Sequence, residues 1–151
     1  MFGAIPPTPR ALGFAGLLPQ AACLLGVVAG GDQWRWIALA TGWGYAALIF
    51  TFLGGTWWGL AAGASRGAKT APDWIWIAAV LPSLIALATF VPWMLGAEWP
   101  GPSLVILGAA IFASPLVDRR LADLAPPWWL ALRVPLSLGL GAMTVALGVL
   151  G

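Results

Sequence analysis

Few side chains in this sequence could carry out chemistry. The 151 residues contain no histidine and a single cysteine, Cys23. Histidine is the usual general base near neutral pH, and histidine or clustered cysteine holds most haem, zinc, copper and iron–sulfur groups. We therefore predict that the protein is not an enzyme and that it binds no cofactor and no metal.

Two charged residues near the end of the chain are the best candidates for a defined polar contact. Asp118 closes one apolar stretch, and Arg133 stands just before the next. Charged side chains at such positions commonly extend to the lipid headgroups. The alternative is an ion pair between Asp118 and Arg133 that ties two helices together. The sequence alone leaves both interpretations open.

Two prolines lie inside apolar stretches, each beside a polar residue. Pro19 and Pro82 remove a backbone donor and favour a kink. A carbonyl freed in this way needs a partner in lipid, and Gln20 and Ser83 could supply one. These four residues are candidates for a polar pocket on a substrate path, and the alternative is that the kinks serve packing alone.

A stripe of glycines is the clearest packing signal. Gly55, Gly59 and Gly63 recur every four residues and so lie along one face of a helix. Glycine at this spacing lets another helix backbone approach closely in a membrane. We predict that a neighbouring helix or a partner subunit packs on this stripe.

The elements that carry these residues are five long apolar stretches. None of the twelve charged residues lies inside them, only 8% of the chain is charged against about 25% in soluble domains, and the mean hydropathy is +0.93. Stretches near 20 apolar residues span a bilayer as helices. The sequence predicts one all-α membrane domain over residues 1–151, a compact bundle of five transmembrane helices at about 11–30, 36–65, 74–95, 102–117 and 134–151. A re-entrant fourth stretch would leave four spans instead.

The basic residues predict the orientation of this bundle. Arg35 stands alone on one side of the membrane, whereas six basic residues fall on the other side: Arg10, Arg66, Lys69, Arg119, Arg120 and Arg133. Short cytoplasmic loops are enriched in Lys and Arg. The N-terminus is therefore expected in the cytoplasm and the C-terminus outside, in the inner membrane of a bacterium.

The eleven tryptophans are typical of belts at the two membrane interfaces. Trp43 lies deeper, and we expect it to pack against another helix; the alternative is that it faces a bound lipid or pigment. Six tryptophans are expected at or near the inner interface: Trp57, Trp58, Trp74, Trp76, Trp128 and Trp129.

The order of several short motifs resembles the domain-of-unknown-function 3429 family, which includes the mitochondrial transmembrane protein 69. These motifs are Phe52-Leu-Gly54-Gly55-Thr-Trp57-Trp58-Gly59, Leu81-Pro82-Ser83-Leu84, Asp118-Arg119 and Pro127-Trp128-Trp129-Leu130. The resemblance spans nearly the whole chain and implies a compact multi-span protein of bacterial or mitochondrial inner membranes. That family often has a histidine where this chain has Trp57, so a role built on that histidine is not expected here.

Three functions remain for such a chain. The missing chemistry favours a non-catalytic accessory or scaffold subunit of a larger membrane complex, such as a respiratory or photosynthetic one. The alternative is a small carrier that binds lipid or a hydrophobic solute, and an enzyme acting on lipid would need a reactive site that the sequence lacks. The expected partners are membrane lipids and other membrane subunits. Nucleic acid is not expected, because the seven basic residues are too few and too scattered.

Overall fold

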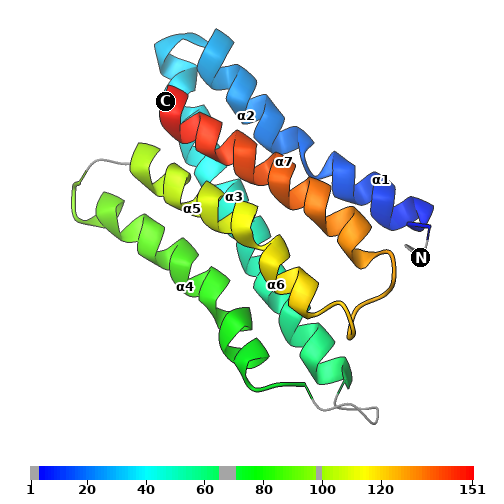
Figure 1. Ribbon diagram of the computed structural model, residues 1–151. Coiled ribbons are helices and arrows are strands. Elements are labelled where there is room, and N and C mark those ends of the chain that lie inside the picture. Colours follow the sequence, from blue (N-terminus) through cyan, green and yellow to red (C-terminus); the bar gives the residue numbers. More distant parts are fainter. Residues whose placement is uncertain (1–3, 65–70, 98–99) are drawn as a thin grey trace.

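The computed structural model describes residues 4–64, 71–97 and 100–151, and every regular element in these ranges is a helix. The helices are α1 (Pro7–Ala15), α2 (Leu18–Ala29), α3 (Gly31–Ala64), α4 (Trp74–Met94), α5 (Gly101–Ala113), α6 (Pro115–Arg120) and α7 (Trp129–Leu150). Figure 1 shows them as an elongated bundle.

Five spans in the described ranges are long and apolar enough to cross a membrane. They are Pro7–Ala29, Gly31–Ala64, Trp74–Met94, Gly101–Arg120 and Trp129–Leu150, which contain 20 to 34 residues each. A helix needs roughly 20 residues to cross the hydrocarbon core. The chain is therefore a multi-pass membrane protein, and the prediction of five helical spans is confirmed.

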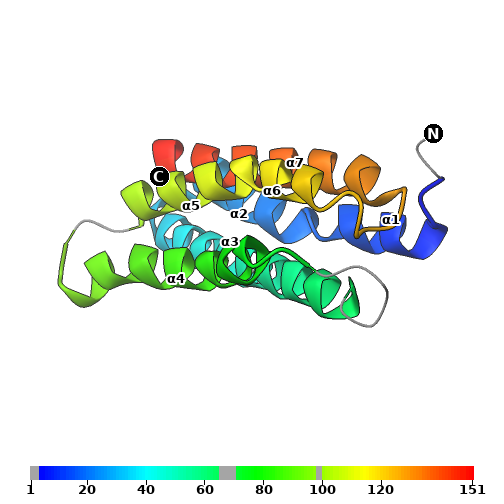
Figure 2. The ribbon, with the colours of Figure 1, turned by 60° about the horizontal axis from the view of Figure 1, so that its bottom comes forward.

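Two of the helices lie at the centre of the arrangement. The helix α7 lies beside α5 and α2, and α3 lies beside α4 and α2 (Figures 1 and 2). The start of α1 and the end of α7 lie at opposite ends of the bundle, as an odd number of spans requires. Three clusters of buried side chains, all including residues of α3, fill the space between the helices.

The first and fourth spans are each made of two helices, and a proline follows each break. Pro115 begins α6, and Pro19 is the second residue of α2. A proline has no N–H to donate to the carbonyl four residues earlier. At the first break the hydroxyl of Tyr45 donates to the carbonyl oxygen of Gly16, which compensates for lost helical bonds. In contrast, α4 continues through Pro82 as one helix.

Glycines bring the backbones of α5 and α7 into direct contact. A Cβ atom added to Gly108 would lie 2.8 Å from the amide nitrogen of Val145 and 2.9 Å from the carbonyl oxygen of Gly141. A Cβ atom on Gly141 would lie 2.8 Å from the amide nitrogen of Phe112. Only a residue without a side chain fits such an approach.

The predicted glycine stripe has a different environment. Gly55, Gly59 and Gly63 are exposed, and an added Cβ atom would meet no atom within 4 Å. The face that α3 turns to α4 includes Gly54, where a Cβ atom would overlap the carbonyl oxygen of Ala79. Neighbouring residues of a helix are rotated by about 100° around its axis. Because Gly54 faces α4, the adjacent Gly55 and the rest of the stripe point outward. No helix of the described chain packs on it, and its contact with a partner subunit stays a prediction.

The fourth and fifth spans also differ from the predicted bounds. The helix α6 extends the fourth span from 117 to Arg120, so it is long enough to cross. The fifth span begins at Trp129 rather than at 134, at a tryptophan that was expected at or near the inner interface. The helix thus includes Arg133, whose charge is paired with the buried carboxylate of Asp118.

Candidate functional site

One buried carboxylate connects three helices near one end of the bundle. Asp118 on α6 is fully buried. Its Oδ1 accepts hydrogen bonds from the indole N–H groups of Trp57 on α3, at 2.9 Å, and Trp129 on α7, at 3.1 Å. Its Oδ2 accepts a bond from Nε of Arg133 on α7, at 3.2 Å. We call these four residues the Asp118 cluster.

The cluster explains how a charged residue can be buried in this bundle. A carboxylate removed from water is costly unless it is paired and hydrogen-bonded, and Asp118 has one cation and two neutral donors around it. Of the two interpretations of Asp118 and Arg133, the structure has the ion pair. Arg133 is only 8% exposed and does not extend to the surface.

The guanidinium of Arg133 has donors left over. Its carbon atom lies 5.8 Å from the centre of the Trp129 ring, within cation–π range. Its Nη2 is buried and has no hydrogen-bond partner. A buried donor without a partner costs about 1–3 kcal/mol, and more when it is charged. Such an atom in a native structure calls for an explanation, and a bound molecule is one.

Arg133 also lines a cavity between α1, α3 and α7. The cavity measures about 370 Å³, within the range of small-molecule sites. Its walls are mainly apolar, and they include Leu12 of α1, Phe52 of α3 and Leu136 of α7. Leu12 and Phe52 are 69% and 66% exposed. The cavity therefore reaches the apolar outer surface of the bundle.

Besides Arg133, the wall has the hydroxyls of Thr56 and Ser137 and the indole N–H groups of Trp128 and Trp129. Trp129 donates to Asp118, and both hydroxyls are engaged within the bundle. The Thr56 hydroxyl donates to the carbonyl oxygen of Leu53 in its own helix, at 2.7 Å. The hydroxyls of Ser137 and Ser114 are hydrogen-bonded to each other at 3.0 Å and join α7 to the end of α5. Arg133 is consequently the one charged side chain that the described residues offer to a molecule in the cavity, beside the indole N–H of Trp128.

The four residues of the predicted polar pocket do not come together. Gln20 is buried and donates to Oγ1 of Thr144 on α7, at 3.0 Å, near Gly42 of α3. Pro82 packs near Gly54 of α3, about 18 Å farther along that helix at 1.5 Å per residue. Two of the four are exposed, namely Pro19 and Ser83.

Two tryptophans of the cluster were expected at the membrane interface. Trp57 is only 3% exposed, because its indole points inward to Asp118. Its expected depth at the inner interface stays a prediction. The sequence places Leu53, Trp57 and Ala61 on one helix face, because they recur every four residues. The structure buries all three. Trp43 packs on α4 as expected: its indole donates to Oγ1 of Thr89, at 3.1 Å, and stacks on Phe90.

The chain matches one family of known sequences over most of its length. A family described as proteins of unknown function, DUF3429, matches residues 5–149. The chain belongs to the DUF3429 family. Curated proteins and solved structures gave no match. All residues of the Asp118 cluster and of the cavity lie within the matched region of this DUF3429 protein.

The site can donate hydrogen bonds from Arg133 to a molecule in the apolar cavity. Within the ranges that the structure describes, no three His, Cys, Asp or Glu side chains gather as a metal site would require. The carboxylate of Asp118 is occupied by its three donors. Among the described residues that line the cavity, no carboxylate or histidine accompanies the hydroxyls, as activation of a nucleophile would need. The arrangement is suited to binding.

Proposed function

We propose that this DUF3429 protein binds a hydrophobic molecule in the cavity between α1, α3 and α7 and does not transform it. The supporting observation is an apolar cavity of about 370 Å³ whose wall includes Arg133, a mostly buried side chain with an Nη2 atom that has no hydrogen-bond partner. The sequence left an accessory subunit and a binding protein open, and the cavity favours the binding protein.

The composition of the wall indicates what can enter. Apolar walls favour an apolar guest, because each buried CH₂ group contributes about 0.8 kcal/mol relative to water. Leu12 and Phe52 stand where the cavity meets the outer surface of the spans, which faces lipid in a membrane. The proposed route of entry is therefore from the acyl chains between α1 and α3.

Two threonines on α3 provide a matched test of this proposal. Thr56 lines the cavity, whereas Thr51 is not among its lining residues. Each hydroxyl donates to a carbonyl oxygen three residues earlier, at 2.7 and 2.8 Å. Thr56→Phe should fill the cavity, and Thr51→Phe should add the same bulk elsewhere on the helix.

The probe is a long-chain alkyl diazirine without a head group, applied to the protein in lipid nanodiscs and activated by light. Saturable labelling is expected for the natural protein and for Thr51→Phe, and a loss of most of it is expected for Thr56→Phe. Equal saturable labelling of the two variants, or none in the natural protein, would refute the binding function.

One observation supports the accessory-subunit function as a second candidate. The stripe of Gly55, Gly59 and Gly63 faces outward along α3 without a helix of the described chain over it. A partner helix could approach closely there. Gly59→Ile meets no atom of its own chain, so loss of a larger assembly in that variant would report partner contact. As a control, Ala88→Ile alters an exposed position on α4.

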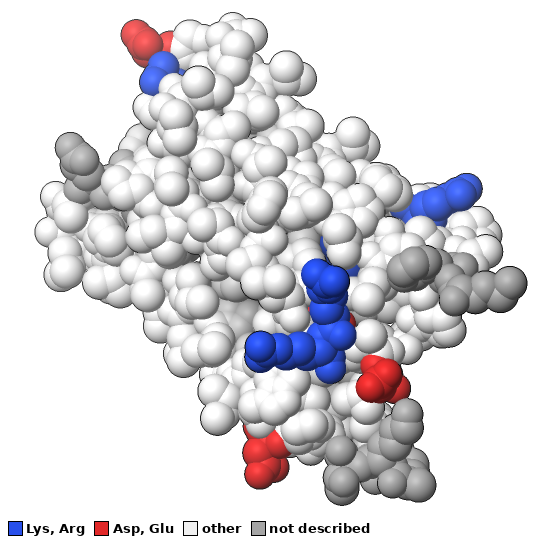
Figure 3. All heavy atoms as spheres, in the orientation of Figure 1, with Lys and Arg blue, Asp and Glu red and all other residues white. Residues whose placement is uncertain are grey.

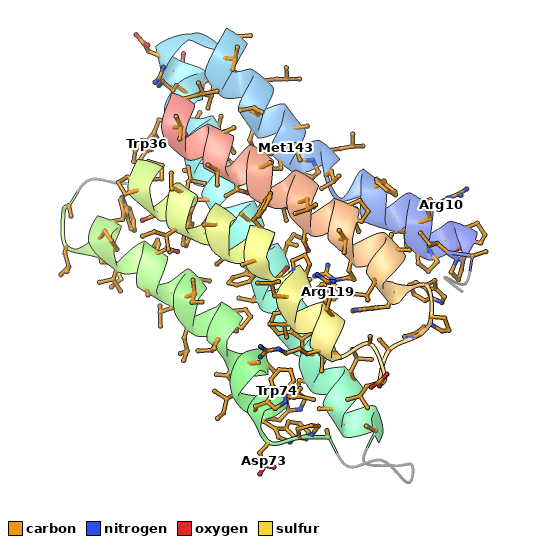
Figure 4. The ribbon with its side chains drawn as sticks, in the orientation of Figure 1. Arg10, Trp36, Asp73, Trp74, Arg119 and Met143 are labelled. Carbon is orange, nitrogen blue, oxygen red and sulfur yellow. The ribbon has the colours of Figure 1, made fainter. Side chains whose placement is uncertain are left out.

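We also propose the predicted orientation, with the start of α1 in the cytoplasm of a bacterial cell. Arg10 and Arg119 lie toward one end of the bundle and Trp36 near the other (Figure 4). On the face in Figure 3, a broad uncharged area separates the charged side chains at the upper-left tip from those at the right edge and in the lower part. The cluster of basic residues at one end supports a cytoplasmic location for that end.

A further inference from the structure

We infer that the molecule bound in the cavity is a neutral, hydrophobic carbonyl compound, whose carbonyl oxygen accepts a hydrogen bond from the guanidinium of Arg133. This inference rests on the proposed binding function and names the class of ligand. Such a carbonyl could belong to a quinone ring or to an acyl ester.

The N–H groups of Arg133 can only donate, so a ligand that pairs with them must accept a hydrogen bond. An arginine side chain has five N–H donors and no acceptor. Its Nε donates to Asp118, while Nη2 is buried without a partner. The side chain keeps 10% of its surface exposed and is part of the cavity wall. A guest placed against this wall can therefore pair with arginine donors that Asp118 leaves unused.

The charge balance of the Asp118 cluster determines that the ligand should be neutral. The single positive charge of Arg133 is already compensated by the carboxylate of Asp118, at 3.2 Å. The described residues place no further charged side chain on the cavity wall. A fatty-acid carboxylate or a phosphate would bring an uncompensated negative charge into an apolar space, which is costly. A carbonyl oxygen satisfies the donor without adding charge.

Apart from Arg133, the cavity wall offers few hydrogen-bond partners, so a ligand with many polar groups would fit it poorly. Thr56 and Ser137 already form hydrogen bonds within the protein. Among the described residues of the wall, the indole N–H of Trp128 is the other side-chain donor left, and it cannot accept a hydrogen bond. Most hydroxyl or amide groups on the guest would therefore be buried without a partner, at a cost comparable to a lost hydrogen bond. The site therefore fits a molecule with one or two acceptors and a long apolar remainder.

Competition against the alkyl diazirine tests this inference. The competitors are methyl palmitate and decyl-ubiquinone as neutral carbonyl compounds, hexadecane as a chain without a head group, and palmitate at a pH where it is ionised. A hydrogen bond to a charged donor should improve competition by about tenfold or more over hexadecane. We expect methyl palmitate or decyl-ubiquinone to surpass both hexadecane and palmitate, and the stronger of the two identifies the source of the carbonyl.

A paired substitution assigns this preference to Arg133. Arg133→Leu alone would leave Asp118 unpaired, so it is combined with Asp118→Asn, whose amide oxygen can still accept from Trp57 and Trp129. In the double variant, methyl palmitate and decyl-ubiquinone should compete no better than hexadecane. The competition order in the natural protein tests the inference even if this variant does not fold.

Two outcomes would overturn the inference while leaving the binding function intact. One is that hexadecane competes as well as the carbonyl compounds. The other is that palmitate competes best, which would assign an anionic ligand. If Thr56→Phe does not reduce saturable labelling, the binding function itself fails, so the two failures are distinguishable.

Discussion

Trp57 donates its indole N–H to the carboxylate of Asp118 over 2.9 Å, although 61 positions separate them in the chain. This contact joins the second span to the fourth, and Trp129 and Arg133 add the fifth span to the same carboxylate. A single acidic side chain thus connects three of the five spans. The cavity lies beside this connection because Arg133 and Trp129 belong to both.

Removing this carboxylate should strongly destabilise the bundle. Asp118→Leu leaves the buried Arg133 uncompensated, and loss of one partner of a buried ion pair costs about 3–5 kcal/mol. Asp118→Asn should cost less, because the amide oxygen can still accept from the two indoles. The free energy of unfolding in detergent measures both effects. A stability of Asp118→Leu equal to that of the natural protein would show that the cluster does not hold the spans together.

Substitution by alanine should destabilise the protein far more at the glycines of α5 and α7 than at those of the outward stripe. Gly141→Ala places a Cβ atom 2.8 Å from a backbone nitrogen, whereas Gly59→Ala meets nothing within 4 Å. Overpacking of this kind costs about 1–3 kcal/mol. We expect a lower thermal midpoint for Gly141→Ala and an unchanged one for Gly59→Ala. The reverse order would mean that the stripe, and not α7, carries the close helix contact.

The hydrogen bond between α2 and α7 should contribute little net stability. Gln20 donates to Thr144 at 3.0 Å, but its own Oε1 is buried without a partner. Gln20→Leu removes the bond and the unpaired oxygen together, and the Thr144 hydroxyl still donates to the carbonyl oxygen of Leu140. We expect a change of less than about 1 kcal/mol in the free energy of unfolding. A loss several times larger would show that this bond organises the two helices.

The proposed orientation predicts the side of each loop. With the start of α1 in the cytoplasm, Gly96 after α4 lies outside and Asp123 after α6 lies inside. A phosphatase that folds only outside the cytoplasm should be active when fused after Gly96 and inactive when fused after Asp123. Activity in the opposite pattern would invert the orientation, and equal activity at both sites would contradict the spans assigned to α5 and α6.

The spans could be predicted from the sequence, but the faces of the helices could not. Long stretches without charge require burial in lipid or protein, and they lie where the helices lie. In a soluble protein a polar face marks the outside of a helix, whereas in a membrane lipid is as apolar as the core. Periodicity therefore showed that Gly55, Gly59 and Gly63 share a face, and it did not show that the neighbouring Gly54 meets α4.

The candidate site was only partly predictable for a related reason. Asp118 and Arg133 stood out because charges are rare in this chain, and their pairing was one of two interpretations. Trp57 was hidden among eleven tryptophans that suit a membrane interface. The cavity depends on residues of α1, α3 and α7 that are far apart in the chain, so no local pattern indicates it.

The position of the photolabel on α7 tests the central claim most directly. Leu132 and Ser137 line the cavity and are only 7% and 2% exposed, whereas Leu138 lies outside it and is 37% exposed. After labelling with the alkyl diazirine, peptide mass spectrometry should find the saturable adduct on Leu132 or Ser137. This adduct should disappear in Thr56→Phe and persist in Thr51→Phe. Adducts found only on outward positions such as Leu138 would contradict the proposal that the cavity binds a hydrophobic molecule.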